Sequence, residues 1–134
     1  MTATRVATVV TAAGSSERMG GAGKKEFRSV GGVPVLALAI RPFLALGRVV
    51  VTLPAEWLAA AAAMLASHLE VTGLKLVEGG VTRQESVRRG LLALADDPPE
   101  VVLIHAGARP WLTPDLVTCV TEAAARCWPF CCTV

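Results

Sequence analysis

The sequence has few aromatic residues and no extended apolar run, and each shortage excludes a class of protein. Its 134 residues include no Tyr, three Phe and three Trp, so it lacks the spaced aromatic platforms on which single-stranded nucleic acids stack. The longest strongly apolar helical stretch, residues 57–66, is too short to span a bilayer. We therefore expect neither a nucleic-acid partner nor a membrane partner.

Net charge and cysteine content are also modest. The formal net charge is +2, but basic residues gather near the glycine-rich segments, which suits a small polyanionic ligand. The N-terminal apolar run Val6–Val10 leads directly into a glycine-rich loop and is a poor match to a signal peptide. The four cysteines all lie late in the chain, so disulfide bonds between them could not link distant parts of the fold. They are Cys119, Cys127, Cys131 and Cys132. These features are consistent with a reducing compartment, and we expect a cytoplasmic protein.

Short apolar segments alternate with helical patterns along the chain. Strands are predicted at Val6–Thr11, Val49–Leu53, Leu74–Val77 and Val101–His105. Helices are predicted at Pro34–Leu46, Ala55–His68, Thr82–Ala95 and Thr113–Arg126. The alternation predicts one α/β domain: a three-layer, Rossmann-like fold with a mostly parallel sheet and helices on both faces.

Local signals support several of these boundaries. Thr82 begins a capping box with Glu85, and Thr113 stands before Pro114, a residue suited to the first position of a helix. Gly31 and Gly32 lie between Phe27–Val30 and Val33–Leu36 and predict a small turn that returns the chain to the first helix.

The segment 12–25 is rich in glycine and follows the first predicted strand. Small residues let backbone N–H groups approach anionic oxygens, and Arg18, Lys24 and Lys25 supply positive charge. A Walker A loop is excluded, because Arg18 and Lys25 stand where glycine and Ser or Thr are required. The dinucleotide-binding fingerprint lacks its second and third glycines. The segment therefore predicts a cradle for a nucleoside triphosphate; the alternative is a solvated surface loop.

Three blocks in order carry a family resemblance. The first reads Ala-Ala-Gly, then Arg-Met-Gly, then a lysine shortly before an aromatic residue; the others are Glu78–Val87 and Val102–Pro110. Together they resemble the 2-C-methyl-D-erythritol 4-phosphate cytidylyltransferases, which have a nucleotidyltransferase-type fold. The resemblance implies transfer of CMP from CTP to that polyol phosphate, with release of pyrophosphate and with Mg²⁺, in isoprenoid precursor synthesis.

The resemblance also implies roles for individual residues. Arg18 and Lys25 match the basic residues that stabilise the transition state, with Lys24 as the alternative to Lys25. The residues implied in nucleotide binding are Ala12, Ala13, Gly14, Ser15, Gly80, Arg83, Ser86, Gly107 and Arg109. Arg83 has two readings, as a nucleotide or turn contact and as a solvated residue. Arg109 is more readily explained as organising its own loop.

His105 ends a predicted strand. The attacking phosphate is already ionised near neutral pH, since the second pKa of a phosphate monoester is about 6. The reaction therefore needs no catalytic base, and we expect a hydrogen-bonded structural histidine.

Two departures from the family stand out. Ala106 occupies the place of an aspartate that binds Mg²⁺ in the family, and a methyl group cannot coordinate a hard cation.

Residues 1–126 are expected to form the nucleotide-binding portion, and 127–134 an atypical cysteine-rich tail where the family continues into a dimerising arm and acceptor-binding residues. This suggests a truncated or altered reading frame, and it puts a homodimer of the family type in doubt. The alternatives are another sugar-phosphate or molybdopterin nucleotidyltransferase and a non-catalytic nucleotide-binding fragment.

Overall fold

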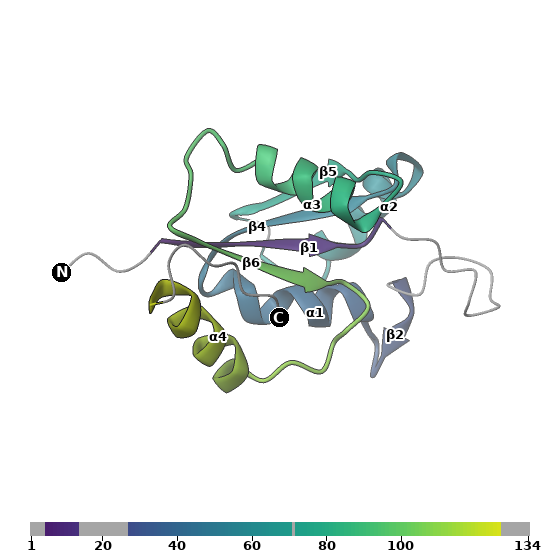
Figure 1. Ribbon diagram of the computed structural model, residues 1–134. Coiled ribbons are helices and arrows are strands. Elements are labelled where there is room, and N and C mark those ends of the chain that lie inside the picture. Colours follow the sequence, from purple (N-terminus) through teal and green to yellow (C-terminus); the bar gives the residue numbers. More distant parts are fainter. Residues whose placement is uncertain (1–4, 14–26, 71, 127–134) are drawn as a thin grey trace.

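The computed structural model of the protein describes residues 5–13, 27–70 and 72–126. Its centre is a parallel sheet of four strands in the order β5-β4-β1-β6 (Figure 1). The strands are β1 (Val6–Thr11), β4 (Gly47–Leu53), β5 (Leu74–Glu78) and β6 (Val101–Ala106). These match the four predicted strands to within two residues at each end. The predicted α/β fold with a parallel sheet is confirmed.

β1, β4 and β6 form where the sequence is rich in β-branched residues, and both faces of the sheet are covered. Val9 and Val10 of β1 are both buried although they face opposite sides, as are Val50 and Val51 of β4. Buried parallel strands show such continuous apolar runs, in contrast to the alternating pattern of half-exposed strands.

A small hairpin joins the first strand's loop to the first helix. It pairs β2 (Ser29–Val30) with β3 (Val33–Pro34) in antiparallel fashion. Its turn residues Gly31 and Gly32 have φ of 60° and 83°, the positive values that a tight hairpin turn requires and that glycine adopts without strain. The predicted turn is confirmed.

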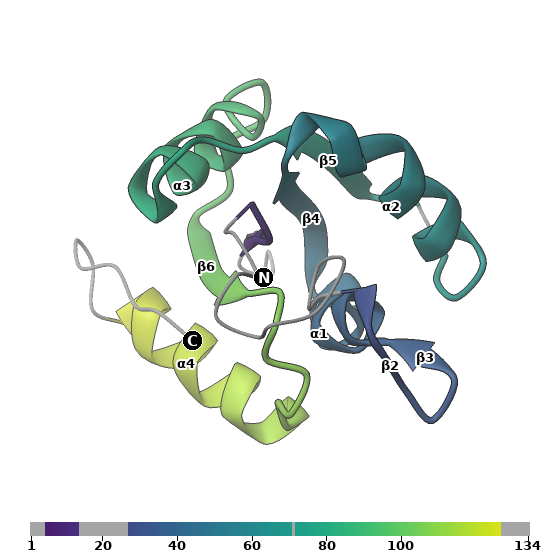
Figure 2. The same cartoon turned by 90° about the vertical axis from the view of Figure 1, so that its right-hand side faces the viewer.

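Among the described residues, three α-helices cover one face of the sheet and one α-helix covers the other (Figures 1 and 2). The first group comprises α1 (Val35–Leu44), α2 (Leu58–Ala66) and α4 (Pro114–Arg126), and the opposite face carries α3 (Arg83–Leu92). A short 3₁₀ turn, η3 (Ala55–Trp57), precedes α2, so the helix predicted from Ala55 begins three residues later than expected. Within the described residues, no helix is long and apolar enough to cross a membrane.

The N-terminal caps form as predicted. The backbone N–H of Glu85 donates to Oγ1 of Thr82 at 3.1 Å. The N–H of Leu116 donates in the same way to Oγ1 of Thr113 at 3.2 Å. Each bond satisfies one of the free N–H groups at a helix start and stabilises the helix by about 1 kcal/mol.

Helix α3 lies unusually close to the sheet, and Gly90 is the reason. A side chain at Gly90 would overlap one methyl group of Val9 and lie 3.1 Å from the other. The absence of a Cβ therefore lets the helix backbone approach β1 directly. This contact fixes the position of α3, and with it the position of every side chain that α3 presents to the carboxyl end of the sheet.

Candidate nucleotide site

The carboxyl ends of all four strands lie along one edge of the sheet. Thr11 at the end of β1 pairs with Thr52 of β4 and with Ala106 of β6, and Leu53 pairs with Glu78 at the end of β5. The arrowheads of β1 and β6 point the same way in Figure 1, toward the side on which β2 lies. The three sequence blocks follow β1, β5 and β6, so the fold brings them to this single edge.

The order of the strands marks a switch point beside β1. From β1 the chain adds β4 and β5 on one side and then returns to place β6 on the other. Open parallel sheets bind ligands outside the carboxyl ends of the strands at such a reversal. Here the N–H of Gly107 donates to the carbonyl of Thr11 at 2.9 Å. A Cβ on Gly107 would lie 3.2 Å from the Cβ of Ala12, so the two loops meet closely at the switch point.

A tight turn, Gly79–Gly80, follows β5. The N–H of Gly79 donates to the carbonyl of Leu53 at 2.8 Å. The N–H of Gly80 donates to Oγ of Ser86 at 3.0 Å, and that hydroxyl lies 3.4 Å from the Gly80 carbonyl, to which it donates. Neither glycine has room for a side chain, because a Cβ would overlap Ala13 at the first position and Glu85 at the second.

An open cavity of about 260 Å³ lies beside this turn. Its wall is formed by residues that follow β1, β4 and β5, together with one side chain from α3. The lining residues are Ala13, Pro54, Ala55, Glu56, Glu78, Gly79, Gly80, Val81 and Arg89. Among them Arg89 is the cation, and Glu56 and Glu78 are the anions. The cavity thus combines a wall of glycine and small apolar residues with a small number of charged groups, as small-molecule sites generally do.

The described residues on either side of the glycine-rich segment also lie at this edge. Ala13 lines the cavity. The ring of Phe27 packs edge-on against Trp57, with ring centroids 4.9 Å apart, next to the Pro54–Glu56 part of the cavity wall. Gly14, Ser15, Arg18 and Lys25, the remaining residues predicted in this segment, lie outside the described residues, as does Lys24.

The structure brings most of the other predicted nucleotide-binding residues to the same edge. Ala12 is buried and Ala13 is half-buried in front of the cavity. Ser86 is buried, with its hydroxyl directed to the Gly80 turn. Gly80 is part of the wall. Gly107 meets Ala12 at the switch point.

The predicted arginines behave differently. Arg83 is exposed on the first turn of α3 and does not line the cavity. The arginine whose side chain contacts the Gly79 turn is Arg89, six residues further along the helix. Both readings of Arg83, as a nucleotide or turn contact and as a solvated residue, stay predictions.

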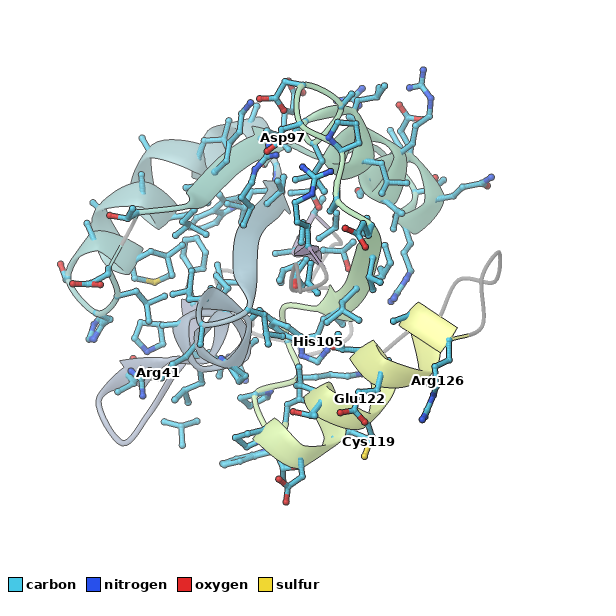
Figure 3. All side chains as sticks on the ribbon, turned by 90° about the vertical axis from the view of Figure 1, so that its left-hand side faces the viewer. Arg41, Asp97, His105, Cys119, Glu122 and Arg126 are labelled. Carbon is cyan, nitrogen blue, oxygen red and sulfur yellow. The ribbon has the colours of Figure 1, made fainter. Side chains whose placement is uncertain are left out.

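His105 is a buried structural residue, as expected. Its side chain is about 2% exposed, and its Nε2 lies 2.9 Å from the carbonyl oxygen of Arg109. The imidazole also packs against the ring of Phe43 in α1, with centroids 5.2 Å apart, between the sheet and the α1–α4 layer (Figure 3). His105 thereby holds the loop after β6 in place, and Arg109 contributes to that loop through its carbonyl and its N–H, which donates to Ala106 at 3.2 Å.

Sequence reasoning missed Arg89, Glu78 and the Pro54–Glu56 segment as parts of the cavity wall. The last could have been found by extending the strand-end rule to the strand that carries no family motif, since its carboxyl end must lie at the same edge. The helical spacing of Glu85 and Arg89, four residues apart, was a signal that these two side chains interact.

The end of β6 does not provide the carboxylate that the family resemblance implies as an Mg²⁺ ligand. Ala106 presents a methyl group at the end of β6, and no group of three or more His, Cys, Asp or Glu side chains comes together anywhere in the described parts of the chain. Mg²⁺ prefers an octahedral set of oxygen ligands. The implied aspartate site is therefore absent at the switch point of this chain.

Sheet order, layers and strand-end site together define a nucleotidyltransferase-like α/β fold of the Rossmann type. The chain matches the family described as "IspD: 2-C-methyl-D-erythritol 4-phosphate cytidylyltransferase" over residues 6–129. It belongs to this family.

Individual relatives agree with the assignment. A "2-C-methyl-D-erythritol 4-phosphate cytidylyltransferase" of Streptomyces coelicolor is 41% identical over 126 residues, which cover 89% of this chain and 46% of the relative. A "Bifunctional enzyme IspD/IspF" of Rhodopseudomonas palustris strain BisB5 is 42% identical over 125 residues, covering 91% of this chain and 31% of the relative. The solved structure of the cytidylyltransferase from Thermus thermophilus aligns with a TM-score of 0.63 at 34% identity, covering 89% of this chain and 49% of that one. The chain thus spans less than half the length of each.

Proposed function

We propose that the protein is a cytidylyltransferase that binds CTP at the carboxyl edge of its sheet and transfers CMP to 2-C-methyl-D-erythritol 4-phosphate. The observation that carries the proposal is the convergence of three family blocks on one edge. They place Ala13, the Gly79–Gly80 turn and Gly107 around or beside a single cavity and switch point.

The arrangement suggests which part of the nucleotide binds at each place along the carboxyl edge of the sheet. The cavity between Ala13, Pro54 and the Gly79–Gly80 turn has a backbone-rich wall suited to a flat pyrimidine base. The switch point between β1 and β6 is the place where the glycine-rich loop leaves the sheet, so it suits the triphosphate. Metal coordination by residue 106 is not part of this proposal, because Ala106 has no ligand atom in its side chain.

For this reaction the protein must position the two substrates and neutralise their negative charge. A phosphate oxygen of the acceptor attacks the α-phosphorus of CTP. As the new oxygen–phosphorus bond forms, the bond between the α-phosphorus and the oxygen that bridges the α- and β-phosphates breaks, and pyrophosphate leaves with the electron pair of the broken bond. The attacking oxygen is already ionised, so no side chain has to remove a proton. This agrees with a buried His105 whose Nε2 contacts the Arg109 carbonyl. Arg18 and Lys25 are proposed to neutralise charge at the α-phosphate.

A second function is favoured by one specific observation. Ala106 removes the carboxylate that the family resemblance implies at the end of β6, and the described residues contain no replacement cluster. A chain of this kind can retain the base cavity and still lack transfer activity. The second candidate is therefore a nucleotide-binding module that holds CTP without reacting.

Pyrophosphate release and calorimetry separate the two functions. Release by the purified 134-residue chain that requires both CTP and the polyol phosphate supports the transferase. CTP binding with no release under any acceptor condition supports the binding module. Absence of CTP binding overturns both.

A further inference from the structure

Arg89 joins three separate parts of the nucleotide site. Its Nη1 donates to the carbonyl of Gly79 at 3.1 Å, and its Nε donates to Oε1 of Glu85 at 3.2 Å. A carboxylate oxygen of Glu78, the last residue of β5, lies 3.9 Å from the same Nη1. The side chain thus spans helix α3, the end of β5 and the turn, while it also lines the cavity.

The contact matters because the turn has few other supports. Of the four backbone polar groups of Gly79 and Gly80, one is held by the sheet and two are directed to the hydroxyl of Ser86. The fourth, the Gly79 carbonyl, is held by Arg89. Glycine has more backbone freedom than any other residue, so two adjacent glycines hold one conformation only when such contacts restrict them.

Arg89 also sets the charge of the cavity. Glu56 and Glu78 line it, and Glu85 lies directly behind the turn, so among the described residues that line the cavity the guanidinium of Arg89 is the positive group that balances these carboxylates. A nucleoside triphosphate is strongly anionic, and uncompensated carboxylates near its base and ribose weaken its binding. A lysine would supply the charge but not the fixed fork of donors that reaches Gly79 and Glu85 together.

We propose that Arg89 is a positioning residue for CTP: it holds the Gly79 carbonyl so that the turn forms the base-recognising wall, and it balances the carboxylates of the cavity. The proposal rests on the function proposed above. It predicts that Arg89 controls both the affinity for CTP and the preference for CTP over UTP, because the turn that Arg89 holds forms part of the cavity wall proposed to contact the base.

The test compares CTP and UTP binding by calorimetry for the full chain and three variants. Arg89→Met removes charge and hydrogen bonds, and Arg89→Lys keeps the charge. Arg88→Met is the matched control: Arg88 is the next residue of α3, is exposed, pairs with the same Glu85 at 3.4 Å, and makes no contact with the turn. Thermal unfolding of each variant shows whether it remains folded.

The expected loss of CTP affinity is about tenfold or more for Arg89→Met, since a charge-assisted hydrogen bond is lost. It is smaller for Arg89→Lys and less than about twofold for Arg88→Met, whose exposed ion pair contributes little. The ratio of CTP to UTP affinity is expected to fall in both Arg89 variants and to stay unchanged in Arg88→Met, which a loss of stability alone would not produce. If folded Arg89 variants bind CTP with the affinity and preference of Arg88→Met, the positioning role is refuted while the proposed function stands. If the unmodified chain binds no CTP, both fall.

Discussion

Substitution of Gly90 by alanine tests the close contact between α3 and β1 on which the site depends. At an open position inside a helix, replacing glycine by alanine stabilises a protein by about 1 kcal/mol. At Gly90 the new methyl group would overlap Val9, which is fully buried and cannot move aside. Overpacking of a filled core costs about 1 to 3 kcal/mol. The net expectation is a loss of up to about 2 kcal/mol.

The assay is urea unfolding monitored by circular dichroism, and it includes two further substitutions for comparison. Val9→Ala removes the methyl groups that the new side chain meets, so the double variant is expected to be more stable than the sum of the single effects by at least about 1 kcal/mol. Ala62→Gly, on an exposed position of α2, measures the helix-propensity contribution in this same chain. The reasoning is refuted if Gly90→Ala raises the free energy of unfolding by the amount that Ala62→Gly lowers it.

Three further predictions concern the helix start, the opposite edge of the sheet and the missing carboxylate. Thr82→Ala is expected to lower the free energy of unfolding by about 1 kcal/mol in urea titrations, because the N–H of Glu85 loses its acceptor; an unchanged midpoint contradicts this. The hydrogen bond from Arg48 lowers the pKa of Asp96, so the ion pair stabilises the fold above the ordinary titration range of the carboxyl, and this contribution is lost as the pH falls through the lowered pKa. The stability difference between the unmodified chain and Arg48→Met should therefore shrink on acidification, and a difference that stays constant speaks against the ion pair. Ala106→Asp is expected to make CTP affinity more dependent on Mg²⁺ in calorimetry, since it restores an oxygen ligand at the end of β6; equal dependence in both forms shows that the position does not bind the metal.

The strands were predictable because each one is a short run rich in aliphatic residues, and β1 begins and ends where the sequence places it. Helix starts were predictable where a side chain caps them, as at Thr82 and Thr113. The start of α2 was not, because the chain first makes a 3₁₀ turn after Pro54, and no capping side chain in the sequence marks where the α-helix begins.

The cavity was only partly predictable. Motifs placed Ala13, Gly80 and Gly107 at strand ends, and parallel pairing brought those ends together. The choice among Arg83, Arg88 and Arg89 depends on how α3 is rotated over the sheet, which is set by the tertiary contact of Gly90 with Val9. Glu56 reaches the cavity only because β4 and β5 are neighbours. The order of the strands in the sheet cannot be predicted from the local sequence of any one strand.

A second cavity is the alternative place at which CTP could bind. It measures about 300 Å³ and lies at the amino-terminal edge of the sheet, lined by residues that include Arg5, Arg48 and Asp97. Its arginines are already engaged: Arg5 pairs with Asp97 at 2.8 Å, and Arg48 donates to the Asp97 carbonyl at 2.8 Å. Asp97 is labelled in Figure 3. These pairings leave the cavity poorly suited to an anionic nucleotide.

Titration of the ¹⁵N-labelled chain with CTP, followed by amide chemical shifts, tests the location of the nucleotide most directly. The amide resonances of Ala13, Gly79, Gly80 and Gly107 are expected to shift together and to saturate at one CTP concentration. Those of residues around Arg48 should stay in place. Shifts concentrated at the Arg48 edge, with the Gly79–Gly80 amides unmoved at saturation, would contradict the account.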